Sequence, residues 1–502
     1  MALKTNSPTV LVCTSGTAVA NYLPAIIEAN HSRIPMIIIT ADRPTHLLNS
    51  GENQTIHQKD IYANFVRESI DIDINNDFNS ILNDIHKALQ FVSKKNSSVL
   101  PGPIHINIHV ENFINQKSTK KSKYIHKKQN KIPPHKFNWS MLPFEDIFNL
   151  YTRKRPLIII GKLNNKLNGQ LINQLSNHLK AAVLVDSLSQ MRFNNKKSFS
   201  LYDNYVDKIE FMPDLIIRIG QKPVSKKLCE KIKSWEKNDN KMVLSSLLID
   251  QANRFNDDCL TTIPCDYKDF IDVIINSTPE NTNSDFYNHI MNLENRVYPL
   301  IKKEEQWSEL AISKVCLASI KNNGNLFIGN SMPIRYIDMI GKLSNDININ
   351  TYSNRGASGI DGVISTALGV SACSNKHNML LIGDLSFLHD QNALLIAKQY
   401  NIDLTVIIIN NNGGGIFSLL PISESVKKKE FNTYWTTPQN IDLKKICTTY
   451  DMKYSKVDTI QKLKAALKKY KNLSGIRIID AQINIDLNKK VLNEIKNKIK
   501  KG

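Results

Sequence analysis

Short apolar runs alternate with helix-like stretches along most of the chain. The run Thr9–Cys13 is followed by a Ser-Gly-Thr turn, a helix-like stretch that reaches Glu28, and a second apolar run, Met36–Thr40. No hairpin turn separates the two runs. A strand, a helix and a strand at this spacing predict a βαβ unit, and therefore a parallel sheet.

The same alternation continues in three blocks, so we predict an α/β fold with three doubly wound parallel-sheet domains. Their predicted bounds are 1–114, 140–300 and 301–502, with a basic linker at 115–139 that lacks apolar periodicity and contains Pro-Pro. The further predicted strands are Ile104–His109 in the first block, Leu157–Ile160, Ala182–Val185, Leu215–Ile219 and Met242–Leu244 in the second, and Leu326–Ile328, Met379–Ile382, Leu404–Ile409 and Ile476–Ile479 in the third.

The composition fits a globular protein, with 41% hydrophobic residues in a chain of 502. No apolar cluster approaches the ~18 uninterrupted residues that a bilayer span requires. The apolar run near the N-terminus is too short for a signal peptide. We therefore expect a soluble, cytoplasmic protein without a membrane partner. The seven cysteines contain no C-x-x-C pair, so a zinc site or disulfide framework is not expected.

The formal net charge of +19 raises the question of nucleic-acid binding. Much of the excess is lysine in two segments, 117–136 and 489–501, that look like a linker and a solvent-facing tail. No helix-turn-helix, RNA-binding or zinc-finger signature accompanies it. Because the chain is also rich in Lys, Asn and Ile, a drift towards AT-rich codons is the better explanation, and we expect no nucleic-acid partner.

The most informative chemistry lies in the segment 379–417. Its pattern predicts one βαβ unit, with the strand Met379–Ile382, a helix from about Phe387 to Tyr400 and the strand Leu404–Ile409. Polar residues and glycines directly follow both strands. Parallel strands end at the same edge of a sheet, and ligands bind at that edge in open α/β sheets.

Asp384 follows Gly383 after the first strand, and Asn411 precedes Gly413 after the second. We expect these residues to meet. The helix N-terminus near Ser386 would offer free N–H groups to an anion such as a diphosphate. Asp384, Asn411 and a backbone carbonyl near Gly413 are hard oxygen donors, which suit Mg²⁺.

Either half of this pattern alone would be weak, because Gly-Asp after a strand and Asn-Gly turns are common. Together, in one βαβ unit, they favour a magnesium–diphosphate site over two unrelated turns.

The pair Gly383-Asp384 with Asn410-Asn411 resembles the diphosphate motif of thiamine-diphosphate enzymes. Further segments resemble one branch, the 2-succinyl-5-enolpyruvyl-6-hydroxy-3-cyclohexene-1-carboxylate synthases of menaquinone biosynthesis. The matching segments cover nearly the whole chain; they are TSGTAVANYLPAIIEA (14–29), TADRP (40–44), GENQTI (51–56), GNSMPIR (329–335), SNRGASGIDG (353–362), GDLSFLHDQNAL (383–394) and NNNGGGIFSLLP (410–421).

The resemblance implies a pyrimidine-binding first domain, a central domain and a diphosphate-binding last domain. It also implies a transferase that uses thiamine diphosphate and Mg²⁺ to decarboxylate 2-oxoglutarate and add the four-carbon unit to isochorismate. The active site would lie between the first domain of one subunit and the last domain of another, which implies a homodimer or homotetramer.

The resemblance also assigns site residues. Both substrates carry two carboxylates, and arginine grips a carboxylate with a bidentate fork. The implied catalytic residues are Ser331, Arg335 and Arg355. The implied substrate contacts are Arg43, Asn53, Gln54, Lys226, Lys227, Phe417 and Leu420, and the implied cofactor contacts are Gly383, Asp384, Leu385, Ser386, Asn411, Gly413 and Ile416.

Each assignment has a simpler alternative. A single arginine is more often a surface charge, and Ile416, Phe417 and Leu420 could be ordinary core residues. Ile416 resembles the apolar residue that props the cofactor in its bent shape. Ser225-Lys226-Lys227 resembles a Ser-Lys-Arg that reaches a substrate carboxylate, and Lys227 keeps the charge of that arginine without its fork.

One departure concerns the start of the chain. The resemblance implies a first domain that begins well before Met1, so we expect this domain to be N-terminally truncated, with an uncovered edge and exposed apolar area. The missing stretch would hold the glutamate that activates the cofactor, and its loss would remove a proton relay worth ~10²–10⁴-fold in rate.

A late start codon, a split or decaying gene, or a piece supplied by another chain would each explain the departure. Two alternatives to the leading prediction therefore stay open: another thiamine-diphosphate decarboxylase or carboligase, and a non-catalytic cofactor-binding remnant.

Overall fold

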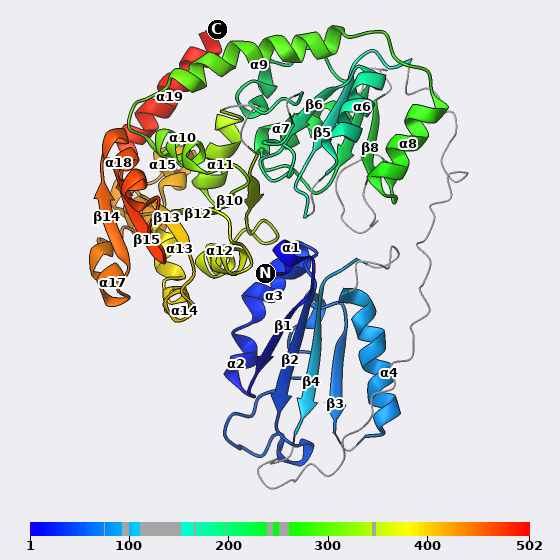
Figure 1. The fold of residues 1–502 in the computed structure, drawn as a ribbon, viewed down its shortest axis with the longest axis vertical. Coiled ribbons are helices and arrows are strands. Elements are labelled where there is room, and N and C mark those ends of the chain that lie inside the picture. The colour runs from blue at the N-terminus through cyan, green and yellow to red at the C-terminus, as the bar shows by residue number, and fades with distance from the viewer. Residues whose placement is uncertain are drawn as a thin grey trace. The chain divides into compact units, whose positions relative to one another are not determined.

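The computed structural model describes residues 1–74, 76–92, 100–110, 152–164, 167–195, 197–237, 244–249, 261–343 and 348–501. These residues form three parallel β-sheets with helices on their faces, which confirms the α/β prediction (Figure 1). The chain divides into two compact units, of which the first contains one sheet and the second contains the other two. The predicted linker at 115–139 lies outside the described residues.

The first sheet has the strand order β1-β2-β4-β3. Its strands are β1 (Thr9–Cys13), β2 (Met36–Asp42), β3 (Ser69–Asp73) and β4 (Pro103–His109). Helices α2 (Thr17–Ala20) and α3 (Leu23–His31) cover one face, and α4 (Phe78–Leu89) covers part of the other; a short α1 (Ala2–Thr5) precedes β1. The sheet is therefore wound on both sides.

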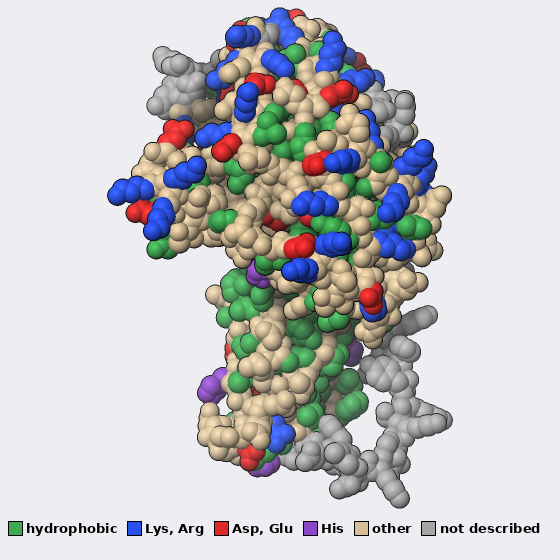
Figure 2. Space-filling model, turned by 90° about the vertical axis from the view of Figure 1, so that its left-hand side faces the viewer, with side chains coloured by type: hydrophobic (Ala, Val, Ile, Leu, Met, Phe, Trp, Pro, Cys, Tyr) green, Lys and Arg blue, Asp and Glu red, His purple; other side chains and the backbone are tan. Residues whose placement is uncertain are grey.

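Strand β1 forms one edge of this sheet. Its side chains alternate, and Val10 and Val12 are 53% and 68% exposed. They pair in register with Ile37 and Ile39, on the face where α4 packs against β3 and β4. On this face the apolar surface of the outer strand is thus open to solvent, and Figure 2 shows apolar side chains gathered on the first unit.

The second sheet has the order β6-β5-β7-β8-β9. Its elements are β5 (Pro156–Ile160), α6 (Gly169–Leu179), β6 (Ala182–Val185), β7 (Leu215–Ile219), α7 (Lys226–Glu236), β8 (Ser245–Ile249), β9 (Thr261–Ile263) and α8 (Tyr267–Ser277). The predicted strand Met242–Leu244 is wrong at its described residue, Leu244, because the strand begins at Ser245. Two serines open β8, and their polarity concealed it in the sequence.

The third sheet has the order β11-β10-β12-β13-β15-β14. The chain passes from β10 to β11 on one side and then returns to β12 on the other side of β10, so the winding direction reverses between β10 and β12. Its strands are β10 (Asn325–Ile328), β11 (Asn350–Tyr352), β12 (Asn378–Gly383), β13 (Leu404–Asn410), β14 (Lys453–Val457) and β15 (Ile476–Gln482). Its helices are α10 (Glu309–Ser319), α11 (Met332–Ile340), α12 (Val363–Ala372), α13 (Asp384–His389), α14 (Ala393–Gln399), α15 (Ile422–Ser425), α16 (Lys428–Phe431), α17 (Leu443–Thr449), α18 (Ile460–Tyr470) and α19 (Ile485–Lys501).

Alternate residues of the central strands face two different cores. Leu381 and Ile407 face helices α10, α11, α18 and α19, whereas Leu380 and Val406 face α12, α14 and α17. The near-continuous apolar runs in these strands follow from burial on both faces.

The second and third sheets share one apolar cluster. It contains Leu157 and Leu184 of the second sheet together with Leu326 and Leu381 of the third. Helix α9 (Asp285–Lys303) also contributes to it, through residues such as Ile290, and the predicted domain bound at 300 falls inside this helix. The two sheets therefore belong to one packed unit.

No helix among the described residues is long and apolar enough to cross a bilayer. On the face drawn in Figure 2, Lys and Arg side chains are scattered and interspersed with Asp and Glu, without a single large basic patch. Such a mixture is typical of an ordinary solvated surface.

Candidate active site

The ends of β12 and β13 bring the predicted metal ligands together. The strands are paired in parallel, with Gly383 opposite Ile409, so Asp384 and Asn411 both emerge at the same edge of the third sheet. Asp384 Oδ2 accepts a hydrogen bond from the Gly413 backbone N at 2.8 Å. The geometry expected from the βαβ pattern is present.

The helix after β12 differs from the prediction. A single helix over Phe387–Tyr400 is wrong, because α13 begins at Asp384 itself and ends at His389, and α14 starts at Ala393. The break at Asp390 has a tertiary cause: its carboxylate accepts hydrogen bonds from Ser365 N at 2.7 Å and Ser365 Oγ at 2.9 Å.

The first turn of α13 is already hydrogen-bonded. The Leu385 N–H donates to Asp384 Oδ1 at 2.9 Å, and Ser386 Oγ donates to the Ile360 carbonyl at 2.7 Å. Asp384 caps this turn with its own carboxylate. Of the free N–H groups expected near Ser386, that of Leu385 is therefore occupied by Asp384.

The residues at this edge fit a hard cation. Asn411 Oδ1 is buried and has no hydrogen-bond partner within the part of the chain that the structure describes. An unpaired buried amide oxygen is costly and points to a missing electrophilic partner. With Asp384 and a main-chain carbonyl, it supplies the oxygen donors that Mg²⁺ prefers.

Glycine is required at position 413. Its φ is +144°, and a Cβ there would lie 2.2 Å from the Thr436 carbonyl oxygen. The adjacent Gly414 N donates to the same carbonyl at 2.7 Å. The backbone of the loop after Asn411 therefore packs directly against the backbone at Thr436, at a distance that leaves no space for a side chain at position 413.

Burial raises the pKa of Asp384 to about 7, although the N–H groups of Leu385 and Gly413 stabilise its charged form. The negative charge of Glu309 acts in the same direction as burial. A bound divalent cation would offset both effects and favour the carboxylate. The site is thus electrostatically short of positive charge.

The end of β10 carries the predicted residues Ser331 and Arg335. Ser331 has φ +67°, a left-handed conformation that is rare for serine, and its carbonyl accepts a hydrogen bond from Arg335 Nη1. Asn330 Nδ2 donates to the carbonyls of Asn354 and Gly359, each at 2.7 Å. These two hydrogen bonds connect the segment 329–335 to the segment 353–362.

Arg355 follows Asn354 in that second segment and is half-buried. Burial lowers the pKa of Arg335, and the nearby carboxylate of Asp203 opposes that shift. Asp203 had no signal in the sequence, yet it also accepts hydrogen bonds from the central-domain residues expected to bind substrate.

Ser225 Oγ donates to Asp203 Oδ1 at 2.5 Å, and Lys227 Nζ donates to the Asp203 carbonyl at 3.1 Å. Lys226, by contrast, is directed to solvent, with its side chain 82% exposed and Nζ 3.4 Å from Glu230. The structure therefore groups Lys227 with Asp203 and gives no contact that supports a role for Lys226, whose assignment stays a prediction.

The three apolar candidates lie on or beside a 3₁₀ helix, Gly415–Leu419. Ile416 packs against the large core cluster, Phe417 is half-buried, and Leu420 is 43% exposed. Ile416 is thus anchored from behind, as both a cofactor prop and a core residue would be.

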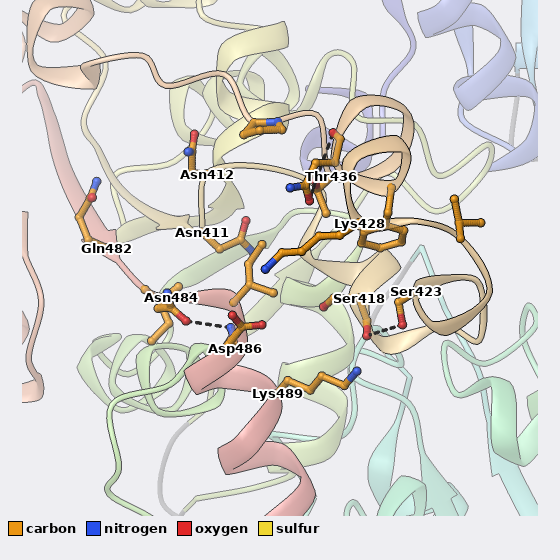
Figure 3. Close-up of a pocket in the computed structure, with 16 residues that line it drawn as sticks. Asn411, Asn412, Ser418, Ser423, Lys428, Thr436, Gln482, Asn484, Asp486 and Lys489 are labelled. Carbon is orange, nitrogen blue, oxygen red and sulfur yellow. Dashed lines mark hydrogen bonds between the residues drawn. The ribbon is translucent and has the colours of Figure 1, made fainter.

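A cavity of about 750 Å³ opens beside Asn411, between the loop that follows it and the start of α19. Figure 3 shows Lys428 and Lys489 reaching towards it from different elements. Its wall includes the hydrogen bond from Ser423 Oγ to the Ser418 carbonyl at 3.2 Å. Asn411 is the one predicted site residue among those that line it.

The first unit holds its own polar cluster at the carboxyl ends of its strands. Asn107 Nδ2 donates to Asp42 Oδ2 and to Asp71 Oδ1, each at 2.8 Å. His109 lies between the Arg43 carbonyl, 2.8 Å from Nδ1, and Asp71 Oδ1, 3.0 Å from Nε2. Two acceptors on one imidazole favour its protonated form, and the pKa of His109 is raised by these contacts against the effect of burial.

A cavity of about 250 Å³ adjoins this cluster and is lined by Asp42, His57, Asp71 and His109 among others. Of the predicted residues, Arg43 directly follows Asp42, while Asn53 is exposed and Gln54 has φ +57°. The alternation of His105, Asn107 and His109 in an otherwise apolar strand was the available signal for this cluster.

Two family models match the chain. The N-terminal TPP binding domain of thiamine pyrophosphate enzymes matches residues 1–61, and the C-terminal TPP binding domain of the same enzymes matches residues 345–481. The second match contains Asp384, Asn411 and Gly413.

Curated relatives match over most of their length. The 2-succinyl-5-enolpyruvyl-6-hydroxy-3-cyclohexene-1-carboxylate synthase of Staphylococcus haemolyticus is 32% identical over 457 residues, which cover 90% of this chain and 79% of the relative. The synthase of that name from Prosthecochloris aestuarii is 32% identical over 474 residues, with the same coverage. That of Bacillus pumilus is 29% identical over 532 residues, covering 100% of this chain and 88% of the relative.

Proposed function

Since this chain belongs to the 2-succinyl-5-enolpyruvyl-6-hydroxy-3-cyclohexene-1-carboxylate synthase family, thiamine-diphosphate-dependent transferases of menaquinone biosynthesis, we propose that its substrates are 2-oxoglutarate and isochorismate. In the proposed reaction 2-oxoglutarate loses carbon dioxide, and its remaining four-carbon unit forms a new carbon–carbon bond to isochorismate.

The observation that carries the proposal is the arrangement around Asp384. Its carboxylate, the unpartnered Oδ1 of Asn411 and the backbone at Gly413 meet at one sheet edge. We assign Mg²⁺ to these three residues, with the cofactor's diphosphate completing its oxygen shell. When bound, thiamine diphosphate supplies the electron sink for decarboxylation and carbon–carbon bond formation.

The protein's own residues bind and orient the substrates. Arg335 is partly buried, which strengthens its attraction for a carboxylate by removing competing water. Asn330, next to Ser331, is held by the carbonyls of Asn354 and Gly359, which flank the segment that carries Arg355. Lys227 adds a positive charge from the central domain, with Asp203 restraining its position.

The predicted contacts of Arg43, Asn53 and Gln54 with substrate belong to the same proposal, as does assembly into a cytoplasmic homodimer or homotetramer. The assembly is proposed from the family resemblance, in which the first domain of one subunit meets the last domain of another; both cofactor-binding modules are matched in this chain, at residues 1–61 and 345–481.

One experiment tests the reaction. Purified protein is incubated with thiamine diphosphate, Mg²⁺, 2-oxoglutarate and isochorismate, and the product is followed by mass spectrometry. The proposal requires carbon dioxide release from 2-oxoglutarate and a product mass equal to the sum of isochorismate and the four-carbon unit.

Other outcomes would assign the chain differently. Carbon dioxide release from pyruvate but not from 2-oxoglutarate would indicate another thiamine-diphosphate decarboxylase or carboligase. Cofactor binding without turnover of any 2-oxo acid would indicate a cofactor-binding protein that is not catalytic by itself.

A further inference from the structure

A buried glutamate lies directly behind the assigned metal ligand Asn411. Glu309, the first residue of α10, is 2% exposed, and its Oε1 accepts a hydrogen bond from Asn411 Nδ2 at 2.7 Å. It lies outside both segments matched by the family models and outside the sequence motifs. We propose that Glu309 is a positioning residue that fixes the Asn411 amide with its oxygen towards the metal ion. This inference rests on the function proposed above.

The chemistry of the contact selects the orientation of the amide. An asparagine side chain can present either its oxygen or its nitrogen, and the two are distinguished by their partners. An ionised carboxylate can only accept hydrogen bonds, and the structure accordingly places the Asn411 nitrogen against Glu309 Oε1. The oxygen then faces the opposite direction, where it has no partner among the described residues.

The surroundings leave room for this one arrangement. A Cβ at Gly415 would lie 2.3 Å from Asn411 Nδ2, so a side chain there would displace the amide. Glycine at position 415 therefore leaves space for the Asn411 nitrogen, and the Glu309 carboxylate binds that nitrogen.

Glu309 is itself held from three directions. Ser308 caps the helix, with Oγ accepting from Ala311 N at 3.1 Å. The Glu309 N–H donates to Asn488 Oδ1 at 3.0 Å, and Asn488 Nδ2 donates to the Tyr336 hydroxyl at 3.0 Å. The Tyr336 hydroxyl also acts on the Glu309 carboxylate: burial raises the pKa of Glu309, and Tyr336 opposes that shift.

These contacts link buried side chains on α10, α11 and α19. Tyr336 is fully buried and Asn488 is 5% exposed. Burying a carboxylate is expensive unless its oxygens are hydrogen-bonded. A leucine would fill the same volume at no such cost, and it would leave Asn411 free to rotate.

The first test compares two substitutions in this network. Glu309→Ala removes the acceptor of Asn411, whereas Tyr336→Phe removes one hydroxyl from the network and leaves the contact of Glu309 with Asn411 in place. Isothermal titration of Mg²⁺ into the full chain with thiamine diphosphate measures the metal affinity without requiring turnover. We expect Glu309→Ala to weaken it roughly 10–100-fold, as outer partners of metal ligands do, and Tyr336→Phe to change it little.

The second test exchanges the chemistry of the pair and stays informative if Glu309→Ala fails to fold. Asn411→Asp alone places two carboxylates against each other and should weaken Mg²⁺ binding. In the double variant Glu309→Gln with Asn411→Asp, the new amide can donate to the new carboxylate, whose other oxygen again faces the ion. We expect the double variant to bind Mg²⁺ at least tenfold more tightly than Asn411→Asp alone.

Equal Mg²⁺ affinities for Asn411→Asp and the double variant would overturn the inference, as would a folded Glu309→Ala protein that binds Mg²⁺ like the wild type. Neither result would contradict the proposed reaction of 2-oxoglutarate with isochorismate. That reaction fails separately, if the wild-type chain binds cofactor and Mg²⁺ but releases no carbon dioxide from 2-oxoglutarate.

Discussion

At the scale of single residues, Asp384 holds a charge that the protein alone does not stabilise. Its carboxylate is 6% exposed and accepts two backbone hydrogen bonds, yet burial still raises its pKa to about 7. A bound cation would stabilise the ionised form of this carboxylate. Its neighbour Asn411 has the matching property, an amide oxygen that is buried and unpaired in the described chain.

Replacing Asp384 by asparagine keeps the shape of the side chain and removes the charge. We expect the Asp384→Asn variant to lose more Mg²⁺-dependent thiamine-diphosphate affinity than the roughly 10–100-fold that loss of an outer partner costs. Calorimetric titration of the cofactor with and without Mg²⁺ measures the effect. Asp451→Asn, at an exposed carboxylate paired with Lys398, is the matched control and should bind as the wild type does.

Lys227 offers a prediction of improvement. Its ammonium donates to the Asp203 carbonyl and lies 3.7 Å from Asp207 Oδ2, so it occupies a defined position while its side chain stays 44% exposed. Lys227→Arg would supply the planar fork that binds a carboxylate with two hydrogen bonds. We expect a lower KM for one of the two substrates at an unchanged kcat.

Lys226→Arg is the control for this change, because that neighbouring side chain is 82% exposed and paired with Glu230. Steady-state kinetics with each substrate varied in turn would decide. A fall in KM for both variants would show that an added guanidinium group improves substrate binding irrespective of the position of Lys227.

At the scale of elements, strand β1 and its neighbour β2 differ sharply in burial. Val12 is 68% exposed on the edge strand, whereas Ile38 on the next strand is fully buried between Val19, Ile26 and Tyr62. The alternation along β1 places only Leu11 and Cys13 against that core. The edge strand β1 is therefore buried on one face only, whereas Ile38 of β2 lies inside the core.

Threonine is β-branched, so placing it in either strand tests burial at nearly constant strand propensity. We expect Ile38→Thr to lower the free energy of unfolding of the first unit by at least about 2 kcal/mol, since it removes a methyl group and buries a hydroxyl. Val12→Thr should stay within about 0.5 kcal/mol of the wild type. Urea unfolding monitored by circular dichroism would measure both, and equal losses would contradict the exposure of Val12.

At the scale of the whole molecule, the second and third sheets are joined by a buried ion pair as well as by a shared core. Arg192 Nη2 lies 2.5 Å from Asp338 Oδ1 on α11, and the arginine also donates from Nε to the Val185 carbonyl at 2.8 Å. The Arg192 side chain has no exposed surface. Because water cannot solvate the buried guanidinium of Arg192, the carboxylate of Asp338 stabilises its charge.

Asp338→Asn would remove the ion-pair partner of a fully buried guanidinium and leave only the weaker influence of Asp186. Removing one partner of such a pair costs about 3–5 kcal/mol, and we expect the second unit to lose stability by that order. Thermal and urea unfolding would measure the loss. The exposed Asp451→Asn again serves as control and should unfold as the wild type does, because solvent screens its partner.

Two histidines, the fully buried His105 and the half-buried His377, predict an acid limit to stability. Burial lowers the pKa of His105 and of His377 from 6.5 to about 4, so both are neutral in the folded protein at neutral pH. Below pH 6.5 the unfolded chain takes up protons that the folded chain refuses, and stability falls as the pH drops from about 6.5 to about 4. Urea midpoints across this range should show the decline.

Replacing either histidine by glutamine, which does not titrate, should flatten that decline. The substitution His46→Gln, at an exposed position, should leave the slope unchanged. A decline that is the same in all variants would assign the acid limit to other groups.

The sequence pattern by itself determined the parallel sheets and the sheet edge at which Asp384 and Asn411 meet. Apolar runs such as Leu404–Ile409 are long enough, and buried enough on both faces, to be strands in any arrangement, and parallel connection then forces Asp384 and Asn411 to one edge. The edge strands Ser69–Asp73, Thr261–Ile263, Asn350–Tyr352 and Lys453–Val457 escaped prediction because polar residues interrupt their apolar runs. Several of these face solvent, as Asp71 and Lys453 do, whereas Asn350 and Thr351 are buried and hydrogen-bonded.

Tertiary structure alone decided which distant residues meet. Glu309 lies 102 positions before Asn411, and Asp203 lies far from Arg335, so no local spacing could pair them. The break at Asp390 likewise depends on Ser365, 25 positions away. Side-chain periodicity indicates which face of a helix or strand is buried. The residue that packs against that face is decided by how the elements pack together. The hydrogen bonds that position Asn411 and Arg335 depend on such packing.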